Sequence, residues 1–262
     1  MGSATKQALT ALSNELDSWG GDLAAAREVL ATVGVFEKEA SLRGALADSE
    51  HDNDRKRQLI ERVLAASAGE RARALLAAAA SHRWSNDQDF LLGVQELGVR
   101  AVAQSSGKAQ EISTELLAIA EAISEDGELE LTLGSKLTAP AAKREIAERL
   151  FGGKVGEATL AVLLGLIEHP MGRRVRRLLS WGADIASAQA QRSVATVTSA
   201  APLPAEQLTR LEAVLSRKYG RQVQLATLID PSVLGGIRVE FGDDVIDDTV
   251  ASRLNDLRRA LA

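Results

Sequence analysis

The strongest restriction on the fold of this chain comes from an internal repeat with a spacing of 87 residues. Charged, glycine and histidine positions recur in the same order: Lys56, Arg57, Glu61, Arg62, Gly69, Glu70 and His82 match Lys143, Arg144, Glu148, Arg149, Gly156, Glu157 and His169. These matches carry more weight than shared Ala or Leu, because the chain is rich in both. A repeat of this length predicts a duplicated structural unit.

Helical periodicity extends over both copies of the repeat, from the N-terminus to about residue 190. Apolar side chains recur every three or four positions, for example at Leu59, Val63 and Leu64, as they do on one face of a helix. Clusters of Gly, Asp and Ser interrupt this pattern and indicate short connections between helices. We therefore predict two helical bundles, over residues 1–104 and 105–191.

The pattern changes near Arg192, where β-branched residues begin to alternate with polar ones, as in half-buried strands. Strands are predicted at 193–198, 223–229, 237–241 and 245–246. A helix is predicted from Pro204 to near Gly220, and another from Asp247 onward. Residues 192–262 are thus expected to form a small α+β module. The predicted fold class is mainly α, with duplicated helical bundles followed by a small β-sheet packed with helices.

The composition excludes several classes of function. The 262 residues include no Cys, which removes disulfides, thiolate catalysis and Cys-type metal sites. A net charge of −5 and an aromatic content of 3% argue against nucleic-acid binding, which relies on basic surfaces and stacking side chains. No apolar run is long enough to predict a transmembrane helix, and Met1–Trp19 lacks the apolar run of a signal peptide.

The histidines give little support for an active site or a metal centre. His82 and His169 occupy the same place in the two copies, near the end of a predicted helix, where an imidazole suits the helix dipole. His51 lies in the polar segment Glu50–Asp54, with no second His close in sequence to share a metal. We expect no catalytic residues, no metal site and no cofactor.

Two further motifs have a chemical and a structural interpretation. Gly152–Lys154 invites comparison with a phosphate loop, but Val155 stands where Ser or Thr would be needed, which favours a helix–helix turn. The acidic cluster within residues 243–248 offers paired carboxylates for acid–base catalysis. Turn formation and helix capping explain the same carboxylates. An enzyme with this cluster or His51 at its site is a minor alternative.

A fairly specific signature lies between Leu225 and Asp247, which reads LATLIDPSVLGGIRVEFGDDVID. Turn residues stand at fixed places among alternating apolar residues. They are Asp230, Gly235, Gly236, Gly242, Asp243 and Asp247. This pattern resembles the delta subunit of the bacterial F-type ATP synthase, whose mitochondrial counterpart is the oligomycin sensitivity-conferring protein.

The resemblance extends in order along the chain. Residues 105–190 resemble the N-terminal helical bundle of that family, and residues 192–262 resemble its C-terminal module. The extra repeat in front resembles the longer delta subunits of high-GC Gram-positive bacteria.

The resemblance implies a non-catalytic stator subunit of the proton-translocating ATP synthase. Such a subunit joins the α3β3 catalytic head to the peripheral stalk of b subunits, so that rotor torque is resisted during ATP synthesis. The helical bundle would bind the N-terminal segment of an α subunit, as a helix in a groove, and the C-terminal module would bind the C-terminal end of the b subunits. The resemblance implies a place on the cytoplasmic face of the bacterial cell membrane, with membrane contact only through the complex and no nucleic-acid partner.

Six apolar residues are candidates for the α-binding groove by the same resemblance. They follow Gly69 or Gly156 on the matching helices: Leu75, Leu76, Leu160, Leu163, Leu164 and Ile167. The alternative is that all six are ordinary bundle core. The glycines of the C-terminal signature are expected to be turn residues with unusual backbone angles rather than contacts. The competing function is a generic helical-repeat adaptor that binds an amphipathic partner helix.

Overall fold

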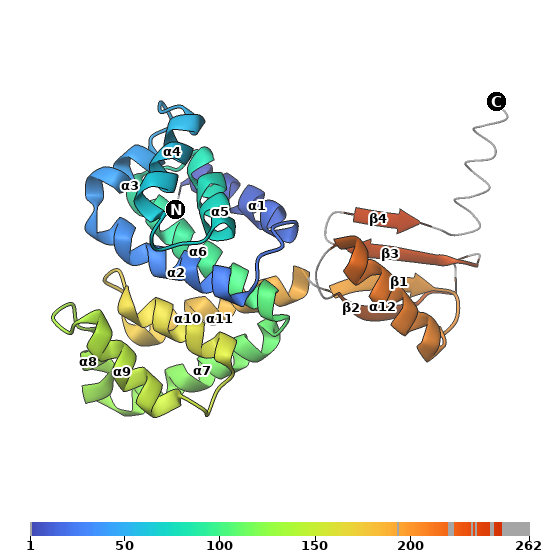
Figure 1. The fold of residues 1–262 in the computed structure, drawn as a ribbon. Coiled ribbons are helices and arrows are strands. Elements are labelled where there is room, and N and C mark those ends of the chain that lie inside the picture. The colour runs from blue at the N-terminus through green and yellow to red at the C-terminus, as the bar shows by residue number, and fades with distance from the viewer. Residues whose placement is uncertain are drawn as a thin grey trace. The chain divides into compact units, whose positions relative to one another are not determined.

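A computed structural model describes residues 2–192, 194–219, 223–231, 233, 235–241 and 244–247. The chain divides into two compact units, Met1–Gln189 and Ala190–Ala262. The first consists of helices and the second contains a small sheet (Figure 1). This architecture confirms the predicted fold class. None of the helices in the described part of the chain is long and apolar enough to cross a membrane.

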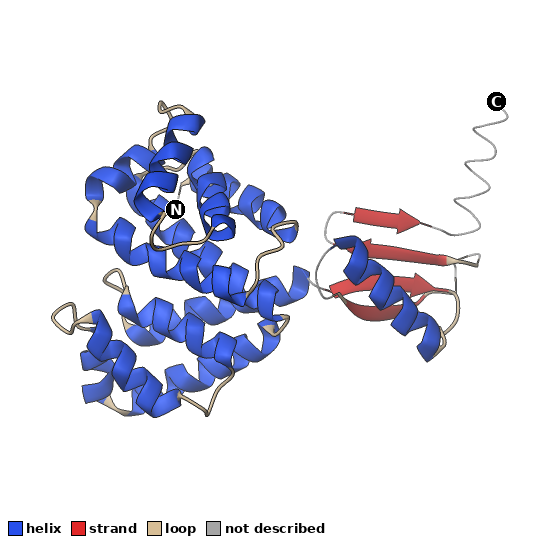
Figure 2. Ribbon diagram, in the orientation of Figure 1, coloured by secondary structure: helices blue, strands red, loops and turns tan. Residues whose placement is uncertain are grey.

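Helices form every regular element described in the first unit (Figure 2). The first copy of the repeat contains α1 (Ser3–Asp17), α2 (Leu23–Lys38), α3 (Ala40–Ala47), α4 (Asn53–Leu64), α5 (Glu70–Ser81) and α6 (Asp87–Ser106). The second copy contains α7 (Ala109–Glu125), α8 (Gly127–Gly134), α9 (Pro140–Phe151), α10 (Glu157–Glu168) and α11 (Val175–Arg192). Helices α3, α4 and α5 have the same lengths as α8, α9 and α10 and start 87 positions earlier. The helices therefore recur at the spacing of the sequence repeat.

A buried lysine makes the same contact in each copy. Lys56 Nζ donates a hydrogen bond to the Ala80 carbonyl at 2.9 Å, and Lys143 Nζ donates one to the Ile167 carbonyl at 3.2 Å. Both carbonyls lie in the last turn of a helix, where no intrahelical donor remains. Both lysines are almost completely buried. The matching Lys positions in the sequence are therefore explained by a shared hydrogen bond, which satisfies a last-turn carbonyl of α5 in one copy and of α10 in the other.

The N-termini of the same two helices are also capped in the same way, by a glutamate carboxylate. The Gly69 amide, before α5, donates to Glu28 Oε2 at 2.7 Å. The Gly156 amide, before α10, donates to Glu115 Oε2 at 3.1 Å. A carboxylate at a helix N-terminus satisfies a free N–H and complements the dipole.

Leu30 joins the two copies within the helical unit. It lies on α2 and is 2% exposed. A Cβ atom added to Gly98 on α6 would lie 2.6 Å from Leu30 Cδ2, and one added to Gly165 on α10 would lie 3.1 Å from Leu30 Cδ1. Glycine at both positions therefore lets α2 approach a helix of each copy closely.

The predicted division of the helical region into domains 1–104 and 105–191 stays a prediction. Its boundary falls in the last turn of α6, and helices of both copies belong to one compact unit.

The second unit is a four-stranded sheet covered on one face by a helix. It contains β1 (Val194–Ser199), α12 (Ala205–Tyr219), β2 (Gln224–Ile229), β3 (Ile237–Phe241) and β4 (Asp244–Asp247). The strand order is β2-β1-β3-β4, and only the β1–β2 pair is parallel. Its core is Ala195, Val197, Leu215, Val223, Val239 and Phe241. The predicted strands and the helix after Pro204 are confirmed; Gly220 and the predicted last helix lie outside the described residues.

Candidate partner-binding site

The six candidate groove residues lie in two different environments. Leu75 and Leu76 on α5, and Leu163 and Ile167 on α10, are buried in the core. A partner would reach these four only if the bundle rearranged. Leu160 is half-buried and Leu164 lies just beneath the surface, and both line a surface cavity.

This cavity, which we call the α2–α10 groove, has a volume of about 220 Å³. Its apolar lining comes from Leu30 and Ala31 on α2 and from Leu160, Ala161 and Leu164 on α10. Methyl groups on both walls can receive one or two apolar side chains of a partner helix.

Charged pairs stand at both ends of the α2–α10 groove. Arg27 Nη2 on α2 is 2.7 Å from Glu157 Oε1 at the start of α10. Arg144 Nε on α9 is 2.6 Å from Glu168 Oε1 at the other end of α10. An apolar floor with charged ends can orient an amphipathic helix that carries complementary charges.

The α2 wall of this groove was missed by sequence reasoning. Arg27 lies 130 positions before Glu157, and the repeat gives no sign that a first-copy helix lies along α10. Only the fold brings these residues together.

The matching helix of the first copy has a different surface. Leu160 and Leu164 on α10 correspond to Arg73 and Ala77 on α5. Arg73 Nε is 2.6 Å from Glu61 Oε2, so its charge is already paired. The first copy therefore presents small and charged side chains where the second presents leucines.

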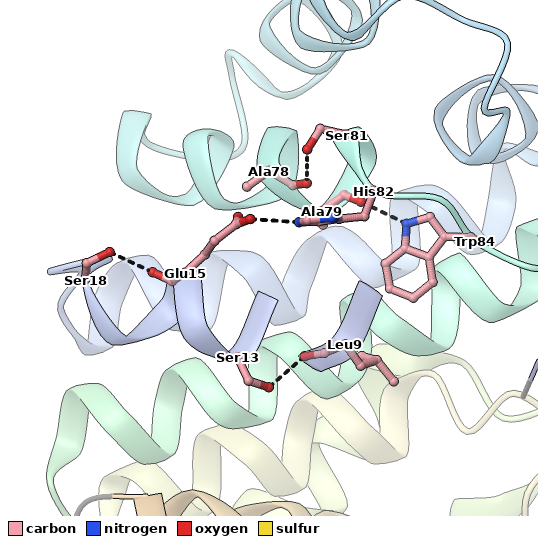
Figure 3. Close-up of polar contacts among 9 residues, drawn as sticks. All are labelled: Leu9, Ser13, Glu15, Ser18, Ala78, Ala79, Ser81, His82 and Trp84. Carbon is pink, nitrogen blue, oxygen red and sulfur yellow. Dashed lines mark hydrogen bonds and ion pairs between the residues drawn. The ribbon is translucent and has the colours of Figure 1, made fainter. Parts of the chain in front are cut away.

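Helix α1 lies beside α5 in the first copy (Figure 3). Glu15 Oε1 on α1 is 2.8 Å from His82 Nε2, and His82 follows directly after α5. Trp84 Nε1 donates to the Ala79 carbonyl at 2.8 Å. These contacts hold the end of α5 in place and give His82 a structural role, as its helix-end position predicts.

The C-terminal signature spans β2, β3 and β4 and the connections between these strands. The Asp230 amide donates to the Ser199 carbonyl at 2.9 Å. Gly235 and Gly236 have φ angles of 76° and 85°, a region that residues with a Cβ atom rarely adopt. Asp247 pairs with Arg238 in the β3–β4 ladder. Gly242 and Asp243 lie outside the described residues.

Among the described residues, no element covers the face of the sheet opposite α12. Neighbouring residues in a strand point to opposite faces of the sheet. The residues that follow the buried Val197 and Val239, which are Thr198 and Glu240, therefore point to this face. Leu228 lies beside Thr198 and Val245 beside Glu240, and both are about half exposed, at 55%. The module therefore presents two apolar side chains at the edges of a mainly polar face.

The histidines and Asp244 make local pairwise contacts in the described part of the chain. His51 is 2.9 Å from Asp48, and His169 is 2.7 Å from Glu37. Groups of three or more potential metal-ligating side chains are not found among the described residues. Asp244 accepts a hydrogen bond from the Tyr219 hydroxyl at 3.0 Å, which ties β4 to α12.

Comparisons with known proteins give one consistent family. The family described as ATP synthase delta (OSCP) subunit matches residues 99–261. The ATP synthase subunit delta of Leifsonia xyli subsp. xyli is 43% identical, with 100% of both chains covered. The protein of the same name from Streptomyces griseus subsp. griseus is 35% identical, again with 100% of both chains covered.

A solved structure shows a weaker likeness. A chain in the cryo-EM structure of the Toxoplasma gondii mitochondrial ATP synthase hexamer has 23% sequence identity and a TM-score of 0.27. The likeness covers 58% of this chain and 86% of that chain.

Proposed function

Because this chain belongs to the ATP synthase delta (OSCP) subunit family, we propose that it is a stator subunit of the peripheral stalk, without catalysis of its own. The observation that carries this proposal is full-length similarity to subunits that bear this name. In this role the chain holds the catalytic head against the torque of the rotor. Two units that bind different subunits suit such a tether, because each contact raises the effective concentration of the other.

We propose the N-terminal segment of an α subunit as the partner of the helical unit. The α2–α10 groove supports this proposal, since Leu160 and Leu164 line an apolar cavity at the surface. The four buried candidates then belong to the bundle core and make no contact with the partner.

We propose the C-terminal end of the b subunits as the partner of the C-terminal module. The open sheet face supports this proposal through Leu228 and Val245, which are exposed without a covering element among the described residues. As part of this complex, the chain would lie at the cytoplasmic face of the membrane without entering it.

Calorimetric titration of the full chain with a peptide of the α-subunit N-terminus tests the first contact. We expect micromolar binding that Leu160→Gln weakens at least tenfold. Arg73→Gln on α5 is the matched control, because Arg73 takes the place of Leu160 in the first copy, and it should leave binding unchanged. Absence of binding, or equal loss in both variants, would contradict the assignment of the groove.

Co-purification from mildly extracted membranes tests the second contact and the function as a whole. The tagged chain should bring down the α, β and b subunits. Leu228→Asp should reduce recovery of b, whereas Ile229→Asp should not, because Ile229 is equally exposed but points to the other face of the sheet. Failure to recover any of these subunits with the unaltered chain would overturn the proposed function.

A further inference from the structure

The two copies contain polar pockets at equivalent places. The first-copy pocket has a volume of about 440 Å³ and the second-copy pocket about 470 Å³. Each lies between the loop before α4 or α9, the buried lysine, and the histidine that follows α5 or α10. These elements supply Lys56 and His82 in one copy and Lys143 and His169 in the other.

The charges around the two pockets differ. In the first-copy pocket, Glu50 and Asp52 balance Lys56 and Arg83. The acidic loop Asp48–Asp52 corresponds to Ser135–Ala139 in the second copy, where Lys136 is the one charged residue. The second-copy pocket therefore has no counterpart of the Glu50 and Asp52 carboxylates, and it has the ammonium group of Lys136 in the same loop.

Side chains of the first copy add further positive charge to the second-copy pocket. Lys38 and Arg43 line it. Arg43 Nε is 2.8 Å from Asp87 Oδ2, so its charge is already paired. Within the described residues, the ammonium groups of Lys38 and Lys136 make no hydrogen bond or ion pair.

The carboxylates that line the second-copy pocket are both engaged. Glu37 Oε2 is 2.7 Å from His169 Nδ1, and Glu168 Oε1 is 2.6 Å from Arg144 Nε. At the base, Lys143 donates to the Ile167 carbonyl, which uses one of its three N–H donors. The ammonium groups of Lys38 and Lys136 at the rim thus have no anionic partner among the described residues, whereas Lys143 at the base also feels the negative charge of Glu37.

The rim of the second-copy pocket also has an unusual backbone. Met171 has a φ angle of 49° and is the one non-glycine residue with a positive φ among those described. Its first-copy counterpart is Trp84, which is buried and fills the space beside Gly93. Residues held in this region of φ/ψ space cluster at ligand-binding loops.

We propose that the second-copy pocket binds a small organic anion that carries phosphate groups. Lys38, Lys136 and Lys143 would hold the phosphates, because an ammonium group suits phosphate as a compact charge. Leu91, Pro140 and Met171 line the same cavity and would contact the organic part. The volume lies in the range of small-molecule sites, about 300–1,000 Å³. This binding is independent of the stator role.

Calorimetry on the full chain at low ionic strength tests the proposal with ADP, pyrophosphate and adenosine as probes. We expect saturable binding of one ADP per chain, weaker binding of pyrophosphate and none of adenosine. Lys38→Met/Lys136→Met should weaken ADP binding at least tenfold. Both lysines are exposed, so this variant should keep its fold, which circular dichroism would check.

The matched control is Arg57→Met/Arg83→Met, which removes two exposed charges from the first copy and should leave ADP binding within twofold. Absence of binding at millimolar ADP would overturn the proposal. So would binding that survives Lys38→Met/Lys136→Met, or an equal loss in both double variants, since that would indicate attraction by overall charge alone.

Discussion

Lys143 and Lys56 are buried lysines that satisfy a backbone carbonyl at the C-terminal end of a helix. Each extends through the bundle to a last-turn carbonyl of α10 or α5. Replacing either by Met removes the donor and leaves that carbonyl without a partner. We expect each substitution to lower the free energy of unfolding by about 1–3 kcal/mol, measured by urea denaturation. Lys154→Met, at an exposed position, should change it by less than about 0.5 kcal/mol.

The same two lysines should make stability depend on alkaline pH. Burial lowers the pKa of both ammonium groups from the ordinary value of 10.5. Between the lowered pKa and 10.5 the unfolded chain binds more protons, so the contribution of these lysines to stability rises with pH. The stability difference between the unaltered chain and Lys56→Met/Lys143→Met should therefore widen as pH rises through this window. A constant difference would contradict the assigned protonation.

At the scale of elements, the contact of α2 with α6 and α10 depends on Leu30 and two glycines. Gly98→Ala places a methyl group against Leu30 and should cost about 1–3 kcal/mol. In a Leu30→Ala background the side-chain obstacle is gone and the nearest remaining atom is the backbone nitrogen of residue 30, at 3.3 Å, so the same change should cost less, helped by the better helix propensity of Ala. A double-mutant cycle measured by urea unfolding would show this coupling between the two positions. Additive effects would indicate that Leu30 and Gly98 act independently.

Most elements could be predicted from local patterns, because helical periodicity and β alternation depend on residues close in sequence. The turn glycines Gly235 and Gly236 are of this kind. The cavities could not be predicted, since the α2–α10 groove and the second-copy pocket are each lined from both copies. Leu163 and Ile167 show the reverse difficulty: an apolar residue on a helix looks the same in sequence whether it lies in the core or at a binding surface.

At the scale of the whole molecule, the two compact units should fold separately. A chain that ends after Arg192 keeps every helix of the first unit. We expect it to show helical circular dichroism and a single cooperative unfolding transition, with a midpoint close to that of the helical unit in the full chain. Loss of cooperativity would show that the first unit needs residues 193–262 in order to fold.

The position of Leu30 between two glycine-lined helices has a mechanical consequence. A force that separates the first copy from the second acts on the contact between α2 and α10, where Leu30 lies against Gly165. Sliding of α2 along α10 meets steric contact, because Leu30 lies against Gly98 on one helix and Gly165 on another. A load that separates the two copies is therefore opposed by the contacts of a single leucine with a helix of each copy.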